Sequence, residues 1–192
     1  MKIGYSVEGS TDRALLRGLR ERWCPDAELV EGRFRGRSGV SQSREIPNTC
    51  RELFAKGADV AVFIRDANNE EWRKVRKADS ARCPDDCRHL AVFAICDRSV
   101  ESWFCSDAGW IAVRTGREAA EFSADDPKGS FESAMKVKAS DKKEHEIAAL
   151  VRDAPLRQWL KNKSFEAFYE DLRQKSKELG CEFENLRQAS EA

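Results

Sequence analysis

Acidic side chains follow three of the strands that the sequence predicts. Glu8 comes after an apolar strand at 2–7, Asp66 ends an apolar run that begins at 59, and Glu101 follows a similar run at 90–96. Parallel strands end at one edge of a sheet, so we expect these carboxylates to lie together. Carboxylates that share a site repel one another unless they are protonated or bind a metal. Ligands that are all oxygen favour Mg²⁺ or Mn²⁺ over zinc.

The first of these acids stands on a glycine turn. Gly9 lets the backbone turn directly after Glu8, and Ser10 or Thr11 can cap the helix that follows. Asp12 falls in the first turn of that helix, so both carboxylates can face the space beyond the strand. The helix dipole alone favours an acid at this position, which is a structural alternative for Asp12.

A basic loop ends the second predicted strand, at 27–34. Arg33, Arg35 and Arg37 stand there among glycines, which would let a phosphate approach the backbone. Arginine presents a planar fork of donors that fits phosphate. The loop is therefore either a phosphate-contacting segment or a solvated turn.

Seven cysteines, an odd number, are scattered through the chain, so we expect reduced thiols rather than a disulfide framework. Cys83, Cys87 and His89 form the only cluster in the sequence. They could bind zinc if a fourth ligand came from elsewhere, but no second Cys or His pair follows at a suitable spacing. We favour a polar loop for this segment.

Helical segments separate the predicted strands. One helix is expected from residue 10 to before Pro25, a second begins at Pro47 and ends at Gly57, and an exposed, charged helix follows at 70–78. This alternation predicts an α/β fold with a mainly parallel sheet flanked by helices.

The residues after about 120 differ in kind. We expect a turn at 125–130 and charged amphipathic helices at 141–151 and 164–179. We therefore divide the chain into a core at 1–120 and a helical extension at 121–192 that packs on it. A chain of 192 residues is long enough for one such compact unit.

Composition narrows the classes of function. The chain has 34 Lys and Arg and 34 Asp and Glu, and this zero net charge argues against a protein that coats polyanions without specificity. No apolar run reaches the roughly 18 residues of a membrane span, and no signal-peptide pattern is present. We expect a cytoplasmic protein that has no contact with membranes.

Two of the acidic motifs together resemble the Toprim fold of topoisomerases, primases and OLD-type (overcoming lysogenisation defect) nucleases. They are Val7 to Asp12 and Phe63 to Asn68. In that fold a Glu follows the first strand and an Asp-x-Asp follows a later one. The Glu-Gly-x-Thr-acid version is most similar to OLD-type nucleases and to a small stand-alone bacterial Toprim-like family often encoded beside ATPases.

The resemblance covers most of the chain. Residues 100–104 look like that family's Glu-x-Trp helix, 126–128 like its Pro-Lys turn, and 143–148 with 164–168 like its C-terminal helices. Asn68 departs from the pattern because it replaces the second Asp. Its amide oxygen can ligate a metal but carries no charge, which favours a single ion over two.

The resemblance implies a metal-dependent nuclease that hydrolyses phosphodiester bonds in DNA or RNA. The implied ligands of Mg²⁺ or Mn²⁺ are Glu8, Asp12, Asp66, Asn68 and Glu101. Glu8 and Asp66 would also be catalytic, together with Lys128, which would steady the phosphate. Arg33, Arg35 and Arg37 would hold the nucleic-acid backbone.

It also implies an effector of bacterial antiphage defence that an ATPase controls. The chain has no P-loop of its own, so we expect an ATPase partner or a homodimer. Trp159, Phe165, Phe168 and Tyr169 would anchor that interface, or else pack on the chain's own sheet.

Two other functions remain open at this stage. A Toprim-like binding or regulatory subunit whose catalytic site has decayed would explain Asn68. A nucleotidyl- or phosphotransfer enzyme is also possible, because Toprim sites serve primases as well.

Overall fold

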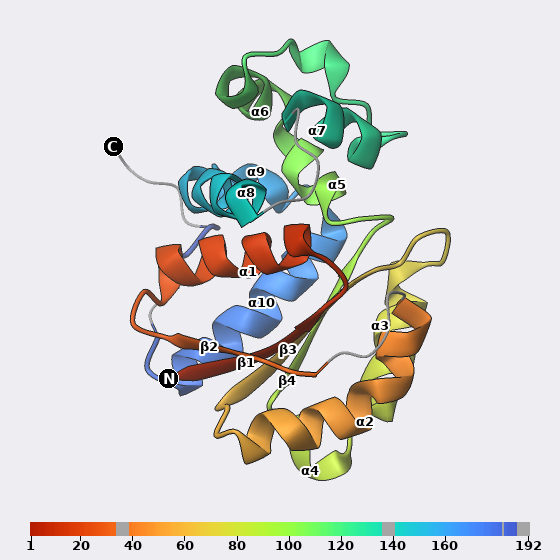
Figure 1. The fold of residues 1–192 in the computed structure, drawn as a ribbon, viewed down its shortest axis with the longest axis vertical. Helices are drawn as coiled ribbons and strands as arrows, with labels where there is room; N and C mark the ends of the chain where they lie inside the picture. The colour runs from red at the N-terminus through yellow and green to blue at the C-terminus, as the bar shows by residue number, and fades with distance from the viewer. Residues whose placement is uncertain (34–38, 136–140, 182, 188–192) are drawn as a thin grey trace.

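A parallel sheet lies at the centre of the protein (Figure 1). The computed structural model describes residues 1–33, 39–135, 141–181 and 183–187. In that part of the chain the sheet has four strands in the order β2-β1-β3-β4. The strands are β1 (Lys2–Val7), β2 (Glu28–Glu31), β3 (Val60–Asp66) and β4 (Ala91–Cys96). Every neighbouring pair is parallel, which confirms the predicted α/β class.

The register brings the ends of three strands to one edge. Val7 of β1 pairs with Ile64 of β3, and Asp66 of β3 pairs with Cys96 of β4. Glu8 and Asp66 are therefore both carried to the carboxyl edge of the sheet, on adjacent strands.

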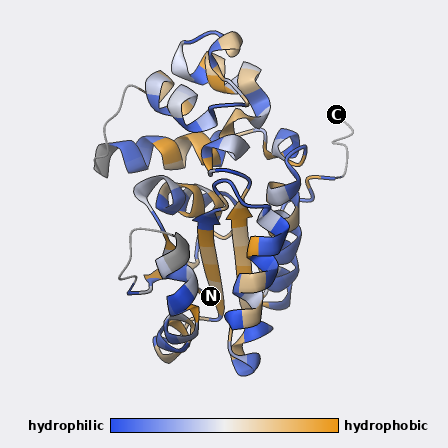
Figure 2. Cartoon of the chain, turned by 90° about the vertical axis from the view of Figure 1, so that its right-hand side faces the viewer, coloured by the Kyte–Doolittle hydropathy of each residue, from blue (hydrophilic) through white to orange (hydrophobic). Residues whose placement is uncertain are grey.

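Helices cover both faces of the sheet. On one face lie α1 (Ser10–Trp23) and α10 (Lys163–Glu178), with α8 (Asp141–Asp153) packed on α1; on the other lie α2 (Gly39–Ala55) and α3 (Trp72–Arg82). Figure 2 shows the hydrophobic strands between helices that carry both hydrophilic and hydrophobic residues. The sheet is thus buried on both faces, as its continuous apolar runs predict.

The remaining helices are shorter. They are α4 (Asp85–Arg88), α5 (Glu101–Phe104), α6 (Ala108–Thr115), α7 (Pro127–Met135) and α9 (Leu156–Trp159), with 3₁₀ turns at Cys105–Asp107 and Ala119–Glu121. In Figure 1, α5, α6 and α7 lie beyond the carboxyl edge of the sheet. They form a cap over the strand ends.

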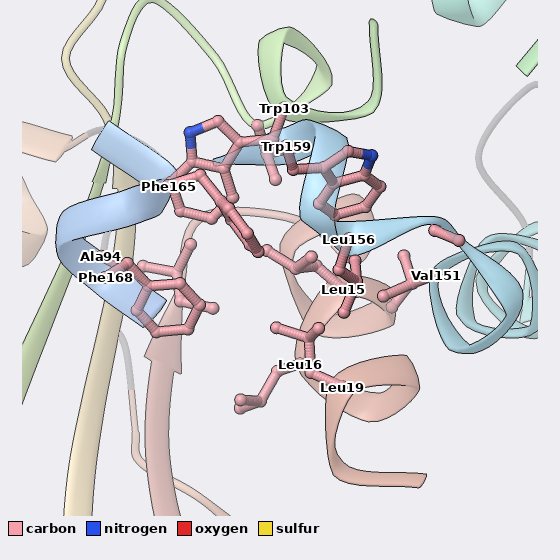
Figure 3. Close-up of a cluster of buried hydrophobic side chains, with 14 of the residues drawn as sticks. Leu15, Leu16, Leu19, Ala94, Trp103, Val151, Leu156, Trp159, Phe165 and Phe168 are labelled. Carbon is pink, nitrogen blue, oxygen red and sulfur yellow. The ribbon is translucent and has the colours of Figure 1, made fainter. Parts of the chain in front are cut away.

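Aromatic side chains from distant segments fill the core beside α1 (Figure 3). The ring centroid of Phe165 lies 5.2 Å from that of Trp103 and 5.3 Å from that of Trp159. Phe168 and Tyr169 are buried in the same core. Of the two alternatives for these C-terminal aromatics, packing within the chain itself is confirmed, and the prediction that they anchor a partner is wrong.

Several predicted boundaries are corrected. The second strand ends at Glu31, and the helix predicted at 70–78 runs from Trp72 to Arg82. Pro47 lies inside α2 instead of opening it. Tertiary hydrogen bonds of Gln42 and Ser43 hold the part of α2 that precedes the proline.

The turn predicted at 125–130 contains the start of a helix. Pro127 is the first residue of α7, a position that needs no backbone N–H. Asp126 Oδ1 accepts a hydrogen bond from Gly129 N at 2.9 Å, as an N-terminal cap does. Lys128 therefore stands on the first turn of a helix.

The expectation of reduced thiols is wrong for one pair. Cys24 follows α1, Cys181 follows α10, and the two form a disulfide with Cα atoms 5.9 Å apart. The two helices lie on the same face of the sheet, which brings their ends together across 157 residues of sequence. The segment with Cys83 and Cys87 contains the short helix α4 instead of a polar loop.

Within the described parts of the chain, no helix combines the length and the apolar character needed to cross a bilayer.

Candidate functional site

A cavity of about 250 Å³ opens at the carboxyl edge of the sheet, between the start of α1 and the cap helices. Five acids line it: Glu8, Asp12, Asp66, Glu101 and Glu132. Two lysines, Lys128 of α7 and Lys143 of α8, line it as well. The cavity therefore combines carboxylates that can bind a cation with ammonium groups that can bind an anion.

Asp12 fixes the turn that carries Glu8. Its Oδ2 atom accepts hydrogen bonds from the backbone N–H of Glu8 at 3.1 Å and of Gly9 at 2.9 Å. This carboxylate satisfies donors at the helix start and holds the backbone of Glu8 in place. Asp12 therefore has a structural role at the start of α1, and it also lines the cavity.

The segment that follows β4 holds Asp66 in place. Its Oδ1 atom accepts a hydrogen bond from Val100 N at 3.1 Å, and Glu101, the next residue, begins α5. Glu101 is 3% exposed and lies close enough to raise the pKa of Asp66. The structure therefore brings Glu101 into the same site as the two strand-end acids.

The carboxylates repel one another. Burial, followed by the charges of Glu101 and Glu8, raises the pKa of Asp66 to about 7, although Lys128 opposes the shift. Burial raises the pKa of Glu8 against the opposing charges of Arg65 and Lys128. Burial and the charge of Asp66 raise the pKa of Asp12 well above its usual value. Such a cluster holds more negative charge than its own lysines offset, and it favours a bound cation or proton.

Sequence reasoning missed Lys143 and Glu132. Lys143 is buried at the start of α8, which packs along α1. Its neighbour Glu144 forms ion pairs with Arg13 at 3.3 Å and with Arg17 at 3.1 Å, both on α1. These contacts hold the start of α8 beside the cavity. No spacing in the sequence predicts them.

The chemistry of the donors fits a hard cation. Glu8 Oε1 is buried and has no hydrogen-bond partner. This carboxylate oxygen could therefore bind a cation in the cavity. Among the described residues, no three His, Cys, Asp or Glu side chains come together closely enough to hold an ion. Mg²⁺ commonly uses only one or two protein carboxylates and completes its shell with water and substrate phosphate. Glu8 and Asp66 are the two carboxylates that would supply such ligands.

Other predicted site residues lie elsewhere. Asn68 is exposed and does not line the cavity, and its φ of 54° is a left-handed conformation that asparagine adopts more readily than most residues. Arg33 is exposed beside Glu52 in a different cavity. Arg35 and Arg37 lie outside the described residues.

Comparison with protein-family models, with curated proteins and with solved structures returns no match.

Proposed function

We propose that this protein is a magnesium-dependent nuclease that hydrolyses phosphodiester bonds in DNA or RNA. The observation that carries the proposal is the convergence of Glu8, Asp66 and Glu101 with two lysines on one cavity at the carboxyl edge of a parallel sheet. Ligands bind at this edge in open α/β sheets. The likeness of the motifs around Glu8 and Asp66 to those of OLD-type nucleases supports the same proposal.

Each side chain has a role in this proposal. Glu8 and Asp66 would hold the ion, Glu101 would add negative charge beside them, and Asp12 keeps the Glu8 turn in place. When bound, Mg²⁺ would orient the scissile phosphate, lower the pKa of the attacking water and offset charge on the leaving oxygen. Lys128 and Lys143 bind the non-bridging oxygens of the phosphate as point charges.

Cleavage assays test the proposal directly. Labelled single-stranded DNA, duplex DNA and RNA are incubated with the protein in Mg²⁺ and in EDTA. We expect cleavage of at least one substrate in Mg²⁺ only, and none above background for Glu8→Gln or Asp66→Asn. Glu178→Gln, which changes an exposed acid near the end of α10, is the matched control and should cleave at the wild-type rate. Wild-type cleavage by Glu8→Gln would refute the assignment.

A binding or regulatory subunit with a decayed site is the second candidate. It is favoured by the absence, among the described residues, of three metal-binding side chains close together. Calorimetric titration with Mg²⁺ and with each nucleic acid separates the two functions. Binding without cleavage would support this candidate, and no binding at all would reject both.

The proposed biological setting follows from the resemblance alone: a cytoplasmic effector of antiphage defence with an ATPase partner or a second copy of the chain. Trp159, Phe165, Phe168 and Tyr169 are buried in the chain's own core, so a partner would have to use another surface. Co-purification with an ATPase encoded beside the protein, and light scattering of the isolated chain, test this setting.

A further inference from the structure

Two buried thiols meet on the face of the sheet opposite α1. Cys50 of α2 and Cys83, at the end of α3, have sulfur atoms 3.3 Å apart. Their side chains are 0% and 1% exposed. The separation is only about 1.3 Å more than a disulfide bond of roughly 2 Å, so a small movement of two side chains would close it.

The surroundings favour oxidation at Cys83. The hydrogen bond from Cys50 lowers the pKa of Cys83, and the positive charge of Arg88 acts in the same direction. Arg88 is anchored there, because its Nη2 donates to the carbonyl of Cys83 at 2.7 Å. The thiolate is the reactive form of cysteine, so Cys83 is the nucleophile of the pair.

A third thiol, that of Cys87, lies near the pair and is slightly more exposed. This residue belongs to α4, shares the apolar cluster with the pair, and is 9% exposed. A local opening of the short helix α4 would give a small neutral oxidant access to Cys83.

We propose that Cys50 and Cys83 form a redox-modified site, in which a peroxide converts the two thiols into a disulfide that joins α2 to the end of α3. The Cys83 thiolate attacks the peroxide, breaks its O–O bond and becomes a sulfenic acid as hydroxide leaves and takes up a proton. The Cys50 sulfur then displaces the hydroxyl group, which leaves as a second water. In total, two thiols and one hydrogen peroxide give one disulfide and two waters.

Peptide mapping tests the proposal on the full chain. The protein is reduced, freed of reductant, oxidised with hydrogen peroxide while native, alkylated in denaturant and digested with trypsin. Cleavage after Arg44, Arg51, Arg82 and Arg88 releases Cys50 in the peptide 45–51, and Cys83 with Cys87 in the peptide 83–88. We expect the two peptides to be recovered as one linked species that separates on reduction.

Cys87→Ser makes the assignment unambiguous, because the peptide 83–88 then holds a single thiol. This variant should keep the link, Cys83→Ser should lose it and return Cys50 alkylated, and Cys105→Ser, which changes a free cysteine elsewhere, should keep it. The proposal is overturned if wild type returns Cys50 alkylated, either with both other thiols alkylated or with Cys83 joined to Cys87. A link that forms only in denaturant would overturn it as well.

Discussion

On the α1 face of the sheet a large cluster of aromatic rings and leucines packs between the helices and the strands, whereas on the α2 face buried polar side chains of the helices bond to groups of the strands. The first face is closed by Trp103, Trp159 and Phe165 together with leucines of α1 (Figure 3). The second holds Arg65 in an ion pair with Asp79 at 3.5 Å. The Ser43 hydroxyl donates to the same carboxylate.

The two faces therefore contribute to the structure in different ways. Apolar burial stabilises without fixing direction, but a buried hydrogen bond requires one geometry. The side-chain amide of Gln42 donates to the carbonyl of Ser6 at 2.9 Å and to that of Ile64 at 3.2 Å. These carbonyls precede Glu8 and Asp66 by two residues each. The hydrogen bonds of Gln42 on the α2 face therefore align the strand ends that carry the candidate site, while the aromatic cluster on the α1 face contributes apolar burial.

The largest loss of stability is expected in the aromatic cluster on the α1 face. Phe165→Ala removes a fully buried ring at the centre of the aromatic cluster and should lower the free energy of unfolding by about 4 kcal/mol. Phe165→Leu keeps most of the volume and should cost about 1.5 kcal/mol or less. Urea denaturation measures both variants, and equal losses would show that ring packing is not what stabilises this face.

On the α2 face, Asp79→Ala removes the carboxylate that forms the buried ion pair with Arg65. We expect a loss of about 3 kcal/mol, because the buried guanidinium of Arg65 loses the charge of Asp79. The double variant Arg65→Met/Asp79→Leu should lose less than the sum of its two single changes. Asp153→Ala, which breaks the exposed pair with Arg114, is the control and should cost less than about 1 kcal/mol. Additive losses would contradict a coupled pair.

At the edge where the two faces meet, stability should depend on pH. Folding raises the pKa of Asp66 from 3.8 to about 7, so the folded state binds this proton more tightly than the unfolded state. The free energy of unfolding in EDTA should therefore fall as the pH rises from about 4 to about 7, and this contribution should then level off. Since a pKa unit corresponds to about 1.4 kcal/mol and Asp66 is half-buried, we expect about 2 kcal/mol.

Denaturation of Asp66→Asn over the same pH range is the control for that effect. The variant cannot titrate at residue 66 and should show a smaller decrease than wild type. Mg²⁺ should raise the stability of wild type more at pH 8 than at pH 5, because protons compete with the ion for the carboxylates. An identical pH dependence in the two proteins would mean that Asp66 has an ordinary pKa.

The smallest effect concerns the contact of α1 with α8. A Cβ atom added at Gly18 would lie 2.4 Å from the carbonyl oxygen of Ala148, so Gly18→Ala should cost about 1–2 kcal/mol through overpacking. Gly109→Ala, on α6, would place its Cβ no nearer than 3.7 Å to any neighbour and should stabilise by about 0.5 kcal/mol. A neutral Gly18→Ala would mean that α8, and Lys143 with it, is not closely fixed on α1.

Much of the core sheet could be predicted from local pattern. The apolar runs that became β1, β3 and β4 are buried on both faces, and such runs separated by helices admit few arrangements. Short edge strands and helix starts were predicted less well. β2 pairs on one side only, and Pro47 lies within a helix that tertiary contacts support.

The sequence alone was enough to place Glu8 and Asp66 at one edge of the sheet, because alternating strands and helices force parallel strands to finish at one edge; the structure shows that their strands are neighbours. Only the tertiary structure added Lys143, from a helix more than a hundred residues beyond Glu8, and showed that Asn68 is exposed and does not line the cavity. It also paired Cys50 with Cys83 and turned the C-terminal aromatics inward. Spacing along a chain fixes which side chains share one face of one element, but which faces meet depends on how all the elements pack together.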